Sequence, residues 1–175
     1  NQVKILEYGL AEKYTNFDPG SGGALDAAIA GAFAKGQPIV TYYWTPTSLM
    51  GKAEIDLVRL TEPAYDKACW DAMMVVVEKI KADGIDAYEP SCANEYKDMA
   101  LRKLATGKFA KAFPTIIEFA NKYSMSTEKV NEMLAYYVDE SDGDMEATAM
   151  HFLNSTSEWE SWVPAEVATK IKSSL

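Results

Sequence analysis

A six-residue run from Ile39 to Trp44 constrains the fold more than any other part of the sequence, because every residue in it is β-branched or aromatic. Residues of these two kinds favour the pleated, half-buried surface of a β-sheet. Pro38 precedes the run and Pro46 follows it closely. The pattern therefore predicts a buried strand over residues 39–44, and residues 56–60 predict a second, shorter strand.

Helical spacing of apolar residues dominates elsewhere. It predicts helices over about 2–13, around 25–33, over about 65–82 and through most of the chain beyond 109. Ser126 and Asp144 stand where N-caps belong, and Pro164 stands where a last helix opens. Loop, helix and strand in this order predict an α/β fold with a mixed sheet, followed by a C-terminal helical segment. Ligands of open α/β sheets bind beyond the carboxyl ends of the strands, where Trp44 is expected.

Composition narrows the class of protein. With 175 residues, 48% of them hydrophobic, the chain suffices for one domain, or for one lobe of a two-lobed protein and part of the other. Its formal net charge of −9 repels nucleic acid and anionic membranes, so we expect neither as a partner. No stretch approaches the roughly 18 apolar residues that span a bilayer. The abrupt start at Asn1, with no signal peptide or initiator Met, predicts a processed or trimmed protein.

Motifs for catalysis, metals and cofactors are poorly represented. His151 is the only histidine, it lies in an amphipathic stretch, and the sequence has no G-x-S-x-G nucleophile elbow. The acidic run 139–144 lacks the residue order of an EF-hand loop. We therefore expect no metal, no cofactor and no catalytic activity, and a small α/β enzyme is the least supported hypothesis.

Two short motifs suit a small ligand. Trp44, with Tyr43 beside it, offers the negative faces of aromatic rings, which recognise quaternary ammonium groups that cannot donate hydrogen bonds. The Gly20-Ser21-Gly22-Gly23 turn opens a helix, whose first backbone N–H groups can bind an anion. Each motif has a plainer interpretation, since the rings can fill a core and the turn can simply lead into the helix.

Cys69 and Cys92 are the two cysteines of the chain. In an oxidising compartment they can pair as a disulfide, whereas in the cytosol they would remain two buried thiols. Their spacing permits the bond without showing that their Cβ atoms meet, so the sequence leaves both states open.

A set of motifs spread over most of the chain carries a family resemblance. It comprises Pro19-Gly20-Ser21, Pro38-Ile39-Val40, Trp44-Thr45-Pro46, Asp56-Leu57, Cys69-Trp70, the segment from Tyr123 to Asn131, and Trp162-Val163-Pro164-Ala165-Glu166-Val167-Ala168. In this order the motifs resemble the second lobe and the C-terminal part of substrate-binding proteins of ABC importers for glycine betaine, proline betaine and choline.

The resemblance implies a protein that captures a quaternary ammonium compound such as glycine betaine or choline. Such a protein delivers its ligand to an ABC permease, performs no reaction, and works in the periplasm or another extracytoplasmic space. The family fold is of the periplasmic-binding-protein type II kind, with two lobes that close over an aromatic cage. Trp44 matches the Trp of the family's Trp-x-Pro motif, and we assign the ligand site to Trp44, Tyr43, Thr47 and Ser21.

The sequence also departs from the family pattern. The family often continues Trp-x-Pro with a His or aromatic residue and another Trp, where this chain has Thr47 and Ser48. The usual first part of lobe one is missing, so we expect residues 1–88 to form the second lobe and residues 89–175 to form a crossing segment and helices that complete the first. Helices built to cover an absent half would expose apolar faces, which predicts self-association. A protein-interaction module with no small-molecule ligand is the alternative.

Overall fold

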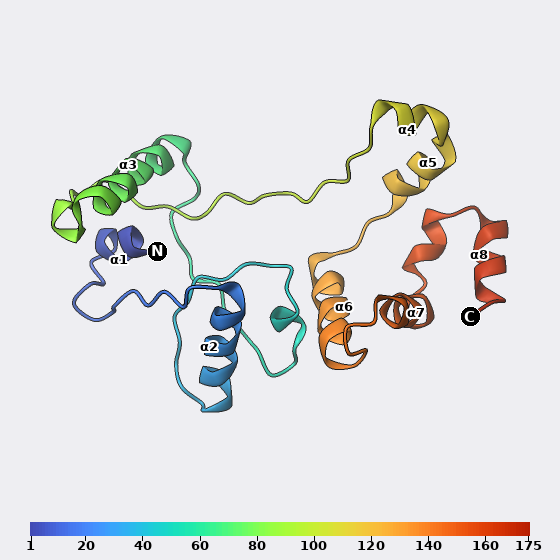
Figure 1. Ribbon diagram of the computed structural model, residues 1–175, viewed down its shortest axis with the longest axis horizontal. Coiled ribbons are helices and arrows are strands. Elements are labelled where there is room, and N and C mark those ends of the chain that lie inside the picture. Colours follow the sequence, from blue (N-terminus) through green and yellow to red (C-terminus); the bar gives the residue numbers. More distant parts are fainter. The chain divides into compact units, whose positions relative to one another are not determined.

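The computed structural model describes residues 1–175 and consists of helices joined by irregular segments (Figure 1). The α-helices are α1 (Gln2–Glu7), α2 (Gly22–Ala34), α3 (Lys67–Asp83), α4 (Gly107–Ala112), α5 (Pro114–Lys122), α6 (Thr127–Asp139), α7 (Met145–Ser155) and α8 (Ala165–Lys172), and the 3-10 helices are η1 (Leu49–Gly51), η2 (Ile85–Ala87) and η3 (Glu158–Trp162). None of these helices combines the length and the apolarity that crossing a membrane requires.

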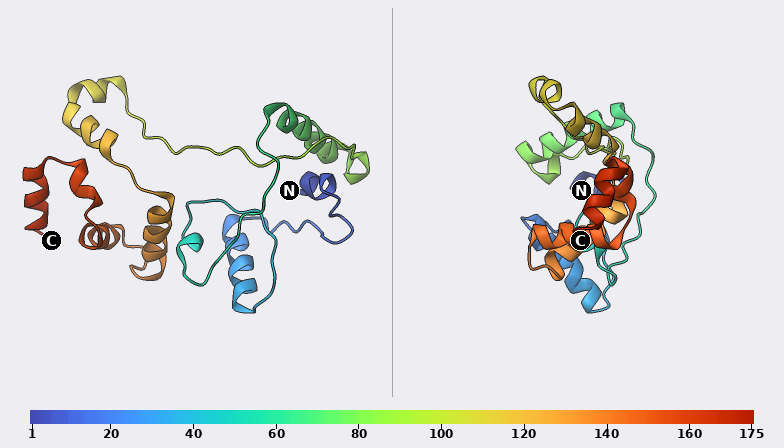
Figure 2. Two further views of the ribbon diagram at one scale, coloured as in Figure 1. Left: turned by 180° about the vertical axis from the view of Figure 1, so that it is seen from behind. Right: turned by 90° about the vertical axis from the view of Figure 1, so that its right-hand side faces the viewer.

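The predicted α/β fold with a mixed sheet is wrong, because the structure contains no strand in any view (Figures 1 and 2). Residues 39–44 keep the two-residue alternation of a strand, with Val40, Tyr42 and Trp44 exposed and the residues between them half-buried. A strand also needs a neighbouring segment that completes its ladder of hydrogen bonds. Residues 56–60, the predicted second strand, are irregular as well. Both runs favour an extended backbone, but neither pairs with another segment to form a sheet.

The helix signals of the C-terminal part are confirmed. The Ser126 hydroxyl accepts the backbone N–H of Lys129 at 3.1 Å and begins α6. The Asp144 carboxylate accepts two backbone N–H groups of the first turn of α7, at 2.8 and 3.0 Å. Pro164 immediately precedes α8. The first helix is shorter than predicted, since α1 ends at Glu7 rather than near residue 13.

The chain forms two compact units, each assembled from two stretches of sequence. The first unit comprises residues 1–28 and 58–100, and the second comprises residues 29–57 and 101–175. In the first, α1 and α3 bury a small core of Val3, Met73 and Val76. In the second, the core is larger and richer in aromatic residues: Met133, Phe152, Trp159, Trp162 and Ala168.

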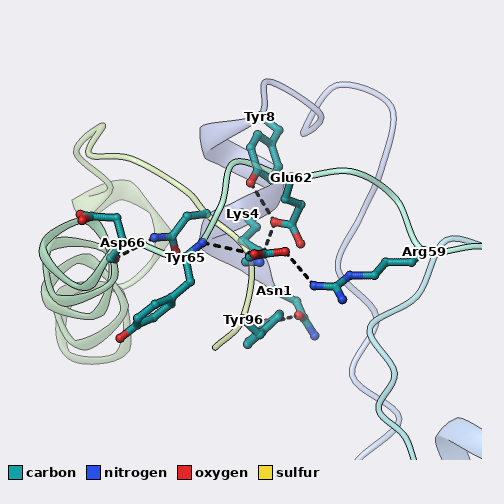
Figure 3. A network of polar contacts seen from close by, with 10 residues as sticks. Asn1, Lys4, Tyr8, Arg59, Glu62, Tyr65, Asp66 and Tyr96 are labelled. Atoms are coloured by element: carbon teal, nitrogen blue, oxygen red, sulfur yellow. Dashed lines mark hydrogen bonds and ion pairs between the residues drawn. The ribbon is translucent and has the colours of Figure 1, made fainter. Parts of the chain in front are cut away.

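The first unit is further held by a disulfide and by a network of polar contacts. Cys69, in the first turn of α3, is bonded to Cys92 in the irregular segment that follows η2. Figure 3 shows the polar network, in which the Glu62 carboxylate accepts the Lys4 ammonium at 2.6 Å and the Tyr8 hydroxyl at 2.8 Å. These contacts fix α1 to the segment before α3.

Because of the Tyr8 hydroxyl, this network should lose stability at alkaline pH. Burial, the hydrogen bond to Glu62 and the negative charge of that carboxylate all raise the pKa of Tyr8 above its usual value of 10.0. A group whose pKa is raised by folding contributes its full stability below the unfolded pKa and loses it as the pH rises beyond that value. We therefore expect the first unit to lose stability above about pH 10, measured by urea unfolding across pH 8–11. Tyr8→Phe should flatten that loss, and an equally steep loss in the variant would contradict the assignment to Tyr8.

Candidate functional site

Three consecutive aromatic residues form a surface cluster in the second unit. The ring centroids of Tyr43 and Trp44 lie 5.0 Å apart with an interplanar angle of 32°, and those of Tyr42 and Trp44 lie 5.9 Å apart with an angle of 37°. The Trp44 side chain remains 44% exposed. Aromatic rings attract a cation through their faces, and Trp is the strongest of the aromatic side chains in this respect.

The loop after Trp44 is fastened to α6 by a single buried amide. The Asn131 side-chain oxygen accepts the backbone N–H of Thr47 at 2.8 Å and the hydroxyl of Thr45 at 3.1 Å. Asn131 itself is only 7% exposed. A buried oxygen that accepts two hydrogen bonds is expensive to leave unpaired, so this contact holds residues 45–47 firmly against the helix. The backbone that carries Trp44 is thereby positioned by α6.

A close backbone contact at Gly51, four residues after Thr47, reinforces this attachment. Gly51, the last residue of η1, lies directly against α6, and a Cβ atom at this position would fall 2.1 Å from the backbone oxygen of Asn131 and 2.9 Å from the Cβ of Ala135. No larger residue fits there without moving the helix or the loop. The segment 45–51 is therefore attached to α6 at both of its ends.

The predicted ligand residues fall into two groups. Trp44, Tyr43 and Thr47 lie together in the loop just described, and Thr47 also accepts the backbone N–H of Met50 through its hydroxyl, at 3.3 Å. Ser21 belongs to the first unit, where its hydroxyl accepts the backbone N–H of Ala24 at 3.2 Å at the beginning of α2. That contact is the local role expected of a serine in front of a helix.

A second aromatic cluster, in the first unit, is in contact with lysine side chains of the same chain. Trp70 lies edge-on to Tyr96 at 5.4 Å, and the Lys4 ammonium stands 4.0 Å from the centre of the Tyr96 ring while it pairs with Glu62 (Figure 3). The Lys97 ammonium lies 5.9 Å from the centre of the Tyr65 ring. These rings therefore stabilise the fold of the first unit.

Sequence reasoning missed two residues of this site. Tyr42 was predicted only as part of a strand, yet its ring packs against that of Trp44. Asn131 could not be assigned to the site from the sequence, because it lies 84 residues from Thr47 in the chain. The one signal that could have pointed to it is an amide one helical turn before Leu134 and Ala135, on a face where a buried polar side chain needs a partner.

Comparison with known proteins identifies the family. The family described as the substrate-binding domain of ABC-type glycine betaine transport systems matches residues 2–155. No curated protein and no solved structure shows a significant match to the chain. Because the family match spans most of the sequence, the protein belongs to the substrate-binding domains of ABC-type glycine betaine transport systems.

Proposed function

We propose that this substrate-binding domain captures a quaternary ammonium compound, such as glycine betaine or choline, on the aromatic cluster around Trp44. Membership of the family supports a small-molecule ligand and an ABC permease as partner. The observation that carries the assignment to this site is the 44% exposure of Trp44 beside two further rings. The domain acts by binding and delivery, without chemical change to the ligand.

The chemistry of the ligand suits the residues of the loop. A trimethylammonium group has no N–H to donate, so it gains most from the faces of Trp and Tyr rings. A carboxylate or hydroxyl at the other end of the ligand needs a hydrogen-bond donor. The Thr47 hydroxyl accepts from Met50, which leaves its own proton for such a contact. Ser21 as a further contact stays a prediction.

Two further parts of the proposal concern the cellular compartment of the domain and its division into lobes. A protein that hands its ligand to an importer works on the outer side of the membrane, which places this one in the periplasm or an equivalent space. The disulfide between Cys69 and Cys92 supports an oxidising compartment. The division into lobes at residue 88 stays a prediction.

Replacing Trp44 tests the assignment directly. Trp44→Ala should weaken the binding of glycine betaine by about 5- to 30-fold, because one desolvated cation–π contact contributes on the order of 1–2 kcal/mol. Isothermal titration of glycine betaine and of choline into both proteins measures the change. Trp44→Phe should lose less affinity than Trp44→Ala, since a smaller ring still attracts the cation. Equal affinity of the alanine variant and the wild type would remove Trp44 from the site.

A ligand control separates charge from shape. In 3,3-dimethylbutyrate a carbon atom replaces the quaternary nitrogen of glycine betaine, so the two compounds share size and carboxylate but differ in the positive charge. We expect the neutral-headed compound to bind more weakly to the wild type and to show little difference between the wild type and Trp44→Ala. Equal binding of the two ligands by the wild type would show that the rings recognise shape alone.

A further inference from the structure

An apolar groove opens on the second unit, away from the loop of Trp44. The cavity measures about 540 Å³ and is lined by apolar side chains of α5 to α8, among them Tyr123, Met133 and Trp162. Met145, at the rim, is 71% exposed. The groove is large enough to take apolar side chains of another molecule, whose removal from water there would be favourable.

The chain segment next to one side of the groove is strongly acidic. The connection between α6 and α7 lies between Tyr137 and Met145, which both line the groove. Residues 139–146 contain no Lys or Arg, and their acidic side chains are all exposed: Asp139, Glu140, Asp142, Asp144 and Glu146. Asp139 pairs with Lys52 and Asp144 caps α7, whereas Glu140 and Glu146 lie in solvent beside the groove. An occupant of the groove should therefore be both apolar and basic.

The same unit exposes a segment with that composition. Residues 101–111 contain four basic residues and no acidic one: Arg102, Lys103, Lys108 and Lys111. Leu101 is 82% exposed and Leu104 is 93% exposed, and neither lies in a helix. Burying two leucines elsewhere would remove this unfavourable contact with water.

The segment does not fill the groove of its own chain. The Lys103 ammonium donates to the backbone oxygen of Tyr123 and lies 5.2 Å from the centre of the Tyr123 ring, at the edge of the groove. With Lys103 in this position, Leu104 still points into solvent. The groove and the basic segment of one chain are thus two complementary surfaces that stay apart.

We propose that two copies of this chain associate by docking the basic segment 101–111 of each copy into the groove of the other. The exchange is reciprocal, so it closes as a two-fold dimer and leaves no surface to extend a fibre. Two equivalent contacts also double the buried area, toward the roughly 1,000 Å² that a specific interface needs. The net charge of −9 on each chain opposes association, and the local pairing of basic segment and acidic rim offsets it at short range.

Light scattering with size-exclusion chromatography tests the dimer. We expect the mass to rise with concentration toward twice the 19.3 kDa of one chain. The double variant Leu101→Ser and Leu104→Ser should raise the dissociation constant of the dimer by about 100-fold or more, because both side chains lose their burial. The matched control is Val58→Ser with Leu60→Ser, two exposed apolar residues of the first unit, which should leave the mass unchanged.

A charge exchange makes the test specific for this pairing. One variant carries Arg102→Glu, Lys103→Glu, Lys108→Glu and Lys111→Glu, and the other carries Glu140→Lys, Asp142→Lys and Glu146→Lys, so that each variant reverses the sign of one of the two surfaces. Each alone sets like charges against each other and should be monomeric, whereas a mixture restores both contacts and should form a mixed dimer. Circular dichroism checks that both variants are folded. A chain that stays monomeric at all concentrations, or a dimer indifferent to the segment variants, would overturn the proposal.

Discussion

Gly51→Ala should lower the free energy of unfolding of the second unit by about 3 kcal/mol or more, at or above the upper end for overpacking of a folded interior. The added Cβ would stand 2.1 Å from the backbone oxygen of Asn131, an atom of α6 that cannot rotate away as a side chain can. Relief requires the loop 45–51 to leave the helix, which also breaks the hydrogen bonds to Asn131. Urea unfolding, followed by the fluorescence of Trp159 and Trp162, measures the loss.

Gly31→Ala is the matched control. Gly31 lies inside α2, and a Cβ at this position meets no atom within 4 Å. The same change of residue should therefore stabilise the protein by about 0.5–1 kcal/mol, because Ala loses less backbone entropy than Gly in a helix. If both variants shifted in the same direction, the cause would be glycine itself and not the contact with α6.

Loss of the disulfide should be the largest change available in the first unit. Cys69 and Cys92 are 23 residues apart, and a cross-link over a loop of this length contributes about 3 kcal/mol by constraining the unfolded chain. The buried apolar core of this unit has only three members, Val3, Met73 and Val76, so little else replaces that contribution. We expect Cys69→Ser with Cys92→Ser to shift its urea midpoint strongly downward, as seen in the fluorescence of Trp70.

Reduction of the wild type provides the control for this variant. Dithiothreitol should lower the wild-type midpoint to that of the double variant and leave the variant unchanged, because both treatments remove the same bond. The transition of the second unit should not move in either case, since neither cysteine belongs to it. A wild type that is indifferent to dithiothreitol would mean that the bond adds little to the stability of the first unit.

The helices could be predicted from the sequence because their signals are local. A cap such as Ser126 or Asp144 and the helix that it begins lie within a few residues of each other, so spacing and residue type suffice. The sheet could not be predicted in the same way. The run from Ile39 to Trp44 records a preference for extended backbone, but a sheet also depends on a distant segment that pairs with it. The structure provides no such segment.

The candidate site could also be predicted only in part: its residue types follow from the sequence, but its long-range contacts do not. Trp44 and Tyr43 could be singled out because the chemistry of a cation site lies in the residue types themselves. The attachment of their loop could not be found, since Asn131 is 84 residues from Thr47 and nothing in the pattern of either segment names the other. The contact of Gly51 with α6 is similar, because a glycine in a loop has many local explanations before a packing partner is known.

The attachment of residues 45–51 to α6 also bears on how ligand preference diverges within such a family. The backbone is held by a buried amide and by a glycine contact, and neither depends on the ring at position 44. Mutations that exchange that ring can therefore accumulate without breaking either contact. On the proposed ligand site, a designed library can therefore vary the ring at position 44 on an unchanged support, whereas substitution of Asn131 or Gly51 removes part of that support.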